Sequence, residues 1–337
     1  MARAVLVGGT GQIGRAAARA LAADGWDVVA ISRSGTVPAG LAELGVQAVA
    51  ADREDGEQLR AALGGGADVL VDCVAYTHAH GEQLNGLAGS VGSLVAISSA
   101  AVYTDDEGRA FTGAETLGAF PQFPVPIPET QRTVEAGDGD YARGKVALEE
   151  TLLGGPLPAT LLRAGAIYGP GSPLPRELFF VKRILDGRTR VVLVSGGASR
   201  FHTVSAENIG ELVRLAAARP GDRLLNAGDP DPPTTTEICR AIAAALDAGL
   251  EPVPIDESEF ERPQLGNPWA TPAPVVLDMS AAERELGYRA VTAYPEAVGP
   301  ACAWIVEELE RGRDWSDSYL GGFFDYAAED AELASRS

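Results

Sequence analysis

Short apolar runs alternate with helical periodicity over the first half of the chain. The runs cover residues 4–7, 28–31, 46–50, 69–74, 94–97 and 159–163. Amphipathic helical stretches lie between them, at residues 15–23, 54–63 and 81–87. Because the runs are apolar throughout and do not alternate with polar residues, both faces of the sheet they form must be covered. The pattern predicts an α/β fold with a doubly wound parallel sheet.

The pattern is less regular beyond residue 169. It predicts helices at 177–186, 207–218, 236–246, 280–286 and 294–310, and strands at 190–194 and 252–255. These elements are too few for a second complete sheet domain, so we expect a smaller lobe interleaved with late strands of the first domain. The expected division is a sheet domain over 1–169, a lobe over 170–313 and an acidic, aromatic tail over 314–337, which either covers the body or is partly disordered. Residues 105–139, with four prolines, should form a long loop over the strand ends.

A glycine-rich turn joins the first predicted strand to the first predicted helix. Glycines in such a turn allow close approach of the backbone, and the helix N-terminus presents free N–H groups to phosphates. The turn therefore predicts a Rossmann-type dinucleotide site, although a purely structural glycine turn is the alternative reading of this segment alone. The expected cofactor contacts are Gly8, Thr10, Gly11, Gln12, Ile13 and Gly14.

The end of the second predicted strand bears on the choice between NAD and NADP. NAD sites place a carboxylate there to bind the ribose 2′-hydroxyl. This chain instead has Arg33 between two serines, and a guanidinium can bind a 2′-phosphate. Arg15 could assist it. The sequence favours NADP, with NAD as the alternative, and a solvated loop charge is the structural reading of Arg33.

Two further patterns carry candidate chemistry. Tyr141 and Lys145 are four residues apart, hence on one helix face, and a nearby ammonium lowers a tyrosine pKa. Such a tyrosine is a usable general acid or base. Ser98 and Ser99 end an apolar strand at the carboxyl edge of the sheet, where ligands bind. Taken singly, a surface helix pair and turn serines explain these residues equally well.

Together, these motifs resemble the extended short-chain dehydrogenase/reductases, the NAD-dependent epimerase/dehydratase family. The resemblance covers about residues 2–210. It implies that Tyr141 is the acid/base, Lys145 holds the nicotinamide ribose and Ser99 polarises the reacting oxygen. It further implies that Asp52 binds the adenine and Arg200 a nucleotide-sugar phosphate. The residues that carry it are 8–14, Asp52, 98–103, 128–130, 141–145, 162–163, 167–170 and 200–204.

Departures from the family pattern narrow the expected activity. Ala100 and Ala101 stand where sugar dehydratases carry Asp-Glu, which argues against dehydration. We expect an NADP-dependent oxidoreductase acting on a carbonyl or carbinol carbon of a nucleotide sugar or secondary metabolite. The alternatives are a nucleotide-sugar epimerase with tightly bound NAD and a non-catalytic dinucleotide-binding protein. Members of the family form a homodimer through helices, and the predicted helix at 81–87 is short for this role. The sequence therefore leaves open whether this chain forms such a homodimer.

Composition limits the partners and the compartment. The net charge of −20 disfavours nucleic acid. No apolar run is long enough for a membrane helix and no signal-peptide pattern is present, so a cytoplasmic protein is expected.

The three cysteines read as small core residues. His78 and His80 lack further ligands for a metal, which leaves a substrate contact or a plain loop pair, and His202 reads as structural. Glu149 is expected to pair with Lys145.

Overall fold

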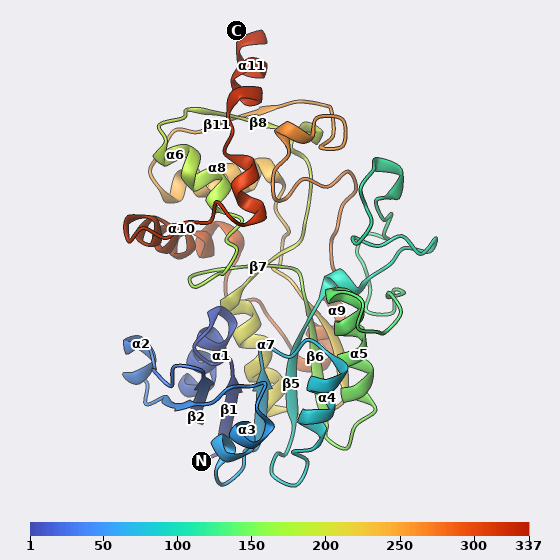
Figure 1. The fold of residues 1–337 in the computed structure, drawn as a ribbon, viewed down its shortest axis with the longest axis vertical. Coiled ribbons are helices and arrows are strands. Elements are labelled where there is room, and N and C mark those ends of the chain that lie inside the picture. Colours follow the sequence, from blue (N-terminus) through green and yellow to red (C-terminus); the bar gives the residue numbers. More distant parts are fainter. Residues whose placement is uncertain (337) are drawn as a thin grey trace.

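A seven-stranded sheet forms the centre of the first domain in the computed structural model, which describes residues 1–336 (Figure 1). The strand order is β10-β6-β5-β4-β1-β2-β3, and every neighbouring pair is parallel. The predicted doubly wound parallel sheet is therefore confirmed. The strands are β1 (Arg3–Val7), β2 (Asp27–Ser32), β3 (Gln47–Ala50), β4 (Val69–Asp72), β5 (Leu94–Ser99), β6 (Ala159–Ala164) and β10 (Arg223–Ala227).

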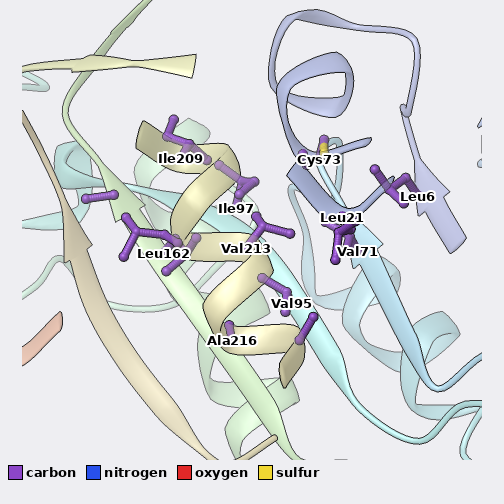
Figure 2. Packing of buried hydrophobic residues seen from close by; sticks show 14 of the residues in the cluster. Leu6, Leu21, Val71, Cys73, Val95, Ile97, Leu162, Ile209, Val213 and Ala216 are labelled. Carbon is purple, nitrogen blue, oxygen red and sulfur yellow. The ribbon is translucent and has the colours of Figure 1, made fainter. Parts of the chain in front are cut away.

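Helices cover both faces of the sheet, as the fully apolar strands require. One face carries α1 (Gln12–Ala23), α2 (Ala39–Ala42), α7 (Ala206–Ala218) and α9 (Ser280–Leu286). Figure 2 shows Ile209, Val213 and Ala216 of α7 lying over Val95 and Ile97 of β5 and Leu162 of β6. The opposite face carries α3 (Gly56–Leu63), α4 (His78–Asn85) and α5 (Tyr141–Leu153).

A second, smaller body stands beyond the carboxyl ends of the strands (Figure 1). Its core is separate from those of the sheet domain. It contains α6 (Leu178–Leu185), α8 (Thr235–Ala245), α10 (Tyr294–Glu310) and the parallel pair β8 (Arg190–Leu193) and β11 (Glu251–Pro254). A further parallel pair, β7 (Ala166–Tyr168) and β9 (Thr203–Ser205), lies in the crossing between the two bodies. The exact domain boundaries expected from the sequence stay a prediction.

The C-terminal tail packs on this lobe. Trp315 and Leu320 are buried in the lobe core. A 3-10 helix (Tyr319–Phe323) and α11 (Ala327–Ser335) follow, and Glu329 of α11 pairs with Arg183 of α6 at 3.1 Å. Of the two expectations for the tail, covering the body holds for residues 314–336, and residue 337 lies outside the described part.

The loop at 105–139 carries a small core of its own. Phe120, Phe123 and Ile127 are buried there with Tyr103. The backbone is irregular except for 3-10 turns at Leu117–Ala119 and, just before the loop, Ala100–Val102. Two more 3-10 turns, Ser195–Gly197 and Pro263–Leu265, lie in the lobe.

The helix predicted at 81–87 begins earlier, at His78. The Thr77 hydroxyl accepts a hydrogen bond from the backbone N–H of His80 and so caps an N-terminus that hydrophobic periodicity does not mark. All three cysteines are free and buried, as expected. Within residues 1–336, no helix has the length and apolarity needed to cross a membrane.

Candidate active site

The glycine turn has the geometry that its spacing predicts. Gly8 has a positive φ of 75°, and a Cβ on Gly14 would lie 2.3 Å from the Gly8 carbonyl oxygen. Only glycine allows α1 to begin this close to the turn. Gly11 is the N-cap of α1, and the Gln12 side chain donates to the Gly169 carbonyl at 3.1 Å. The first turn of α1 therefore lies beside the segment that leads into the lobe.

Arg33 and Asp52 lie at the carboxyl ends of β2 and β3. Arg33 is exposed, and its guanidinium has no hydrogen-bond or ion-pair partner among residues 1–336. Asp52 is exposed and accepts a hydrogen bond from the backbone N–H of Glu54 at 3.0 Å. The adjacent Arg53 is buried instead, in an ion pair with Asp72 at 2.7 Å. A dinucleotide fits this arrangement, because the glycine turn stands at the N-terminus of α1 and Arg33 has a free cationic group.

Ser99, Tyr141 and Lys145 come together at the carboxyl edge of the sheet. Ser99 ends β5, and its hydroxyl lies close enough to Tyr141, the first residue of α5, to act on the Tyr141 pKa. Lys145 lies one turn further on, with its Nζ 5.7 Å from the centre of the Tyr141 ring. The Lys145 ammonium donates to the carbonyl oxygens of Ala75 and Ile97, both at 2.7 Å. The three residues singled out by the sequence thus form one cluster.

The titration of this cluster differs from the expected one. Burial lowers the pKa of Lys145 to about 8, because the charged ammonium is poorly solvated there, and the nearby Asp72 opposes this shift. The pKa of Tyr141 lies above its usual value, since the buried part of this half-exposed side chain disfavours the phenolate, while the nearby Ser99 hydroxyl acts in the opposite direction. The expected lowering of the Tyr141 pKa by Lys145 is absent from this geometry.

Glu149 is not the partner of Lys145, and that expectation was wrong. Its carboxylate binds the Arg163 guanidinium at 2.7 and 3.0 Å and accepts from the Ser98 hydroxyl at 2.5 Å. All three side chains are buried. Arg163 lies on β6, directly beside Ser98 of β5, and takes the carboxylate because two parallel N–H donors match its two oxygens. The pair anchors α5, which carries Tyr141 and Lys145, to the sheet.

The histidines make local contacts. His78 hydrogen bonds with the Thr151 hydroxyl at 2.7 Å, and His80 accepts from the backbone N–H of Tyr76 at 2.9 Å. His202 is buried between the Asp229 carbonyl and the backbone N–H of Leu277, each at 2.8 Å, in the structural role expected of it. Within residues 1–336 no group of three or more potential ligands is arranged to hold a metal ion.

Arg200 contacts residues at and before the start of the lobe helix α8. Its guanidinium donates to the Pro232 carbonyl and lies 4.0 Å from a Glu237 carboxylate oxygen. The next residue, Phe201, carries the Arg176 guanidinium over its ring at 5.4 Å. The structure therefore leaves the proposed phosphate contact of Arg200 as a prediction, with Arg176 as a second cation in the same region.

Sequence reasoning missed Tyr76. Its ring lies 4.3 Å from the Lys145 Nζ and 5.9 Å from the Tyr141 ring, so it touches two of the three catalytic candidates. Tyr76 follows β4 by four residues, and the only sequence signal was its place at the carboxyl edge of the sheet.

Solved structures with a similar fold include an epimerase and a dehydratase. UDP-glucose 4-epimerase from Thermotoga maritima is 17% identical with a TM-score of 0.67, and the match covers 91% of this chain and 99% of that one. WbmG from Bordetella bronchiseptica, solved with NAD, is 19% identical with a TM-score of 0.66, over 90% and 94% of the two chains. The dTDP-glucose 4,6-dehydratase of Bacillus anthracis, also with NAD, is 15% identical with a TM-score of 0.66, over 92% and 98%. At these identities the likeness shows the fold alone.

Sequence comparison with curated proteins finds no match. The model of the NAD dependent epimerase/dehydratase family does match, over residues 4–228, which include all seven strands of the central sheet and the cluster of Ser99, Tyr141 and Lys145. Because that match covers more than half of the chain, the protein belongs to the NAD dependent epimerase/dehydratase family.

Proposed function

We propose that the protein is an NADP-dependent oxidoreductase of this family that acts on a carbonyl or carbinol carbon. One observation carries the proposal: Ser99, Tyr141 and Lys145 meet at the carboxyl edge of the sheet, which also holds the glycine turn. Open α/β sheets bind their ligands at this edge.

Each of the three residues has a role in this proposal. Ser99 holds the reacting oxygen by a hydrogen bond. Tyr141 donates a proton to that oxygen in reduction, and its raised pKa keeps the phenol protonated for this task. Lys145 binds the nicotinamide ribose and orients it. When bound, the nicotinamide supplies or accepts the hydride, and the protein contributes orientation and electrostatics.

NADP is preferred in this proposal because of Arg33. No carboxylate stands at the end of β2 to bind a ribose 2′-hydroxyl, and the Arg33 guanidinium has no partner among the described residues. The hydroxyls of Ser32 and Ser34, 3.4 Å apart, add hydrogen-bonding groups on either side of it. A 2′-phosphate would satisfy these groups together.

A nucleotide-sugar epimerase with retained NAD is the second candidate. The solved relatives favour it, since WbmG and WbmH of Bordetella bronchiseptica were both solved with NAD and the Thermotoga maritima enzyme is an epimerase. Ala100 and Ala101 in place of an Asp-Glu pair continue to argue against dehydration. The substrate class in either case is a nucleotide sugar or a secondary metabolite, possessing a carbinol or ketone carbon.

Cofactor binding tests the proposal first. The purified protein is assayed for copurified dinucleotide and then titrated with NADPH and NADH. We expect reversible, selective binding of NADPH, and Arg33→Ala should weaken it about tenfold or more without weakening NADH, since one charge-assisted interaction is lost. Arg284→Ala removes another exposed guanidinium and should change neither affinity.

Two outcomes would decide against it. An unchanged NADPH preference in Arg33→Ala would remove the reason for choosing NADP, and tightly retained NAD would favour the epimerase. Once a substrate is found, Tyr141→Phe should abolish turnover and preserve cofactor binding. An active Tyr141→Phe variant would refute the proton-transfer role.

A further inference from the structure

Tyr76 separates the Lys145 ammonium from solvent. An ammonium has three N–H donors, and Lys145 directs two of them to the carbonyls of Ala75 and Ile97. The Tyr76 ring lies over the same nitrogen at 4.3 Å. Lys145 is 2% exposed, whereas Tyr76 is 43% exposed. The ring is therefore a cover with one side on the ammonium and the other toward water.

The backbone of Tyr76 is held in place from both sides. Its N–H donates to His80 Nδ1 at 2.9 Å, which ties it to the first turn of α4. Its carbonyl oxygen packs against α5, where a Cβ on Gly144 would lie only 2.8 Å from it. Gly144 stands between Tyr141 and Lys145, so the absence of a side chain there lets Tyr76 approach both of them. The fold therefore holds the Tyr76 ring against α5.

We propose that Tyr76 is a positioning residue of the active site, whose ring caps the Lys145 ammonium and supports the Tyr141 ring. The ring faces the nitrogen for a cation–π contact and lies 5.9 Å from the Tyr141 ring at an interplanar angle of 51°. Both contacts limit the directions that the proton-transferring groups can take. The proposal rests on the proposed function for its catalytic meaning, but the contact itself is tested without any substrate.

The chain has only two lysines, Lys145 and Lys182, which makes amine labelling a direct readout of this cap. Lys182 lies on the lobe helix α6 with a side chain 37% exposed, and so serves as the internal reference. The protein is treated with an acetylating ester at about pH 7, where Lys145, with a pKa of about 8, is still mostly an ammonium and only its small neutral fraction reacts, and the two sites are quantified by mass spectrometry.

We expect Tyr76→Ala to raise the acetylation rate of Lys145 relative to Lys182 roughly fivefold, the size of effect that a partly exposed cation–π contact has on an equilibrium. Tyr76→Phe keeps the ring and should match the wild type. Tyr319→Ala removes another exposed tyrosine, 51% accessible, from the lobe surface and is the matched control. Thermal unfolding of each variant verifies that the fold is retained.

An unchanged ratio in folded Tyr76→Ala would overturn the proposal. A rise in Tyr76→Phe as large as in Tyr76→Ala would also overturn it, since the ring would then not be the cap. Added NADPH separates this result from the proposed function. If Lys145 binds the cofactor, NADPH slows its acetylation in Tyr76→Ala, and a lack of protection counts against the cofactor assignment alone.

Discussion

Buried ionisable side chains in this protein differ in how their charges are compensated. Glu149 is neutralised by Arg163, and the Lys145 ammonium donates to two carbonyl oxygens. Glu177, which precedes α6, is 2% exposed and forms no ion pair within residues 1–336. Burial raises its pKa to about 7, and its own backbone N–H and the nearby Arg176 guanidinium offset only part of the shift. Such a carboxyl should make stability depend on pH.

We expect Glu177→Gln to stabilise the protein at neutral and alkaline pH. The folded state holds a proton on Glu177 that the unfolded state releases near pH 4.5, so this residue lowers stability as pH rises from about 4.5 to about 7. The amide cannot ionise, and the gain over wild type should reach about 3 kcal/mol above pH 7 and shrink at lower pH. Urea unfolding at several pH values measures it. A gain independent of pH would contradict the assigned ionisation.

At the scale of elements, α1 and α7 pack with their backbones in close contact. A Cβ on Gly210 of α7 would lie 2.8 Å from the Ala16 carbonyl oxygen of α1. Backbone atoms cannot move aside as a flexible side chain could, so the two helices would have to separate. These helices cover the sheet next to the glycine turn, and their spacing thus bears on the position of the cofactor site.

Gly210→Ala should therefore destabilise the fold by about 1–3 kcal/mol, despite the higher helix propensity of alanine. The matched control is Gly40→Ala in α2, where the new Cβ would meet open space and a gain of about 0.5–1 kcal/mol is expected. Denaturant unfolding of the two variants gives the comparison. Equal effects of the two substitutions would show that α1 and α7 are not in close contact.

Elements with a strong local signal were predicted well. The α9 and α10 helices match the predicted 280–286 and 294–310, and Gly287 ends α9 in the left-handed conformation. In contrast, β10 was missed, because the apolar run around Leu224 and Leu225 is short and becomes a strand only through pairing with β6. Sequence periodicity carries no information about that pairing.

At the scale of the whole molecule, the C-terminal tail packs into the core of the lobe. Leu320 is fully buried against residues of α6, α8 and α10. The buried ion pair between Arg183 of α6 and Glu329 of α11 holds α11 against the lobe. The lobe core is therefore completed by the last segment of the chain, and its stability should depend on that segment.

Leu320→Ala should lower the free energy of unfolding by about 2–5 kcal/mol, the range for truncating a buried leucine. Leu174→Ala removes an exposed leucine, 43% accessible, and should change it by about 0.5 kcal/mol or less. Chemical denaturation monitored by tryptophan fluorescence reports directly on the lobe, since Trp269, Trp304 and Trp315 lie in its core cluster. A loss below about 1 kcal/mol for Leu320→Ala would mean that the tail is not part of the lobe core.

Local patterns in the sequence predicted the parallel sheet, the glycine turn and the shared helix face of Tyr141 and Lys145, because backbone conformation and helical spacing are local properties, and the family resemblance added Ser99. The pairing of charged groups and the contacts between rings came only from the folded structure. Glu149 binds Arg163 and not Lys145, and Tyr76 covers Lys145, since strands and helices far apart in the chain meet at one edge of the sheet. Helical spacing shows which residues share a face, but partners from other segments depend on how those faces pack.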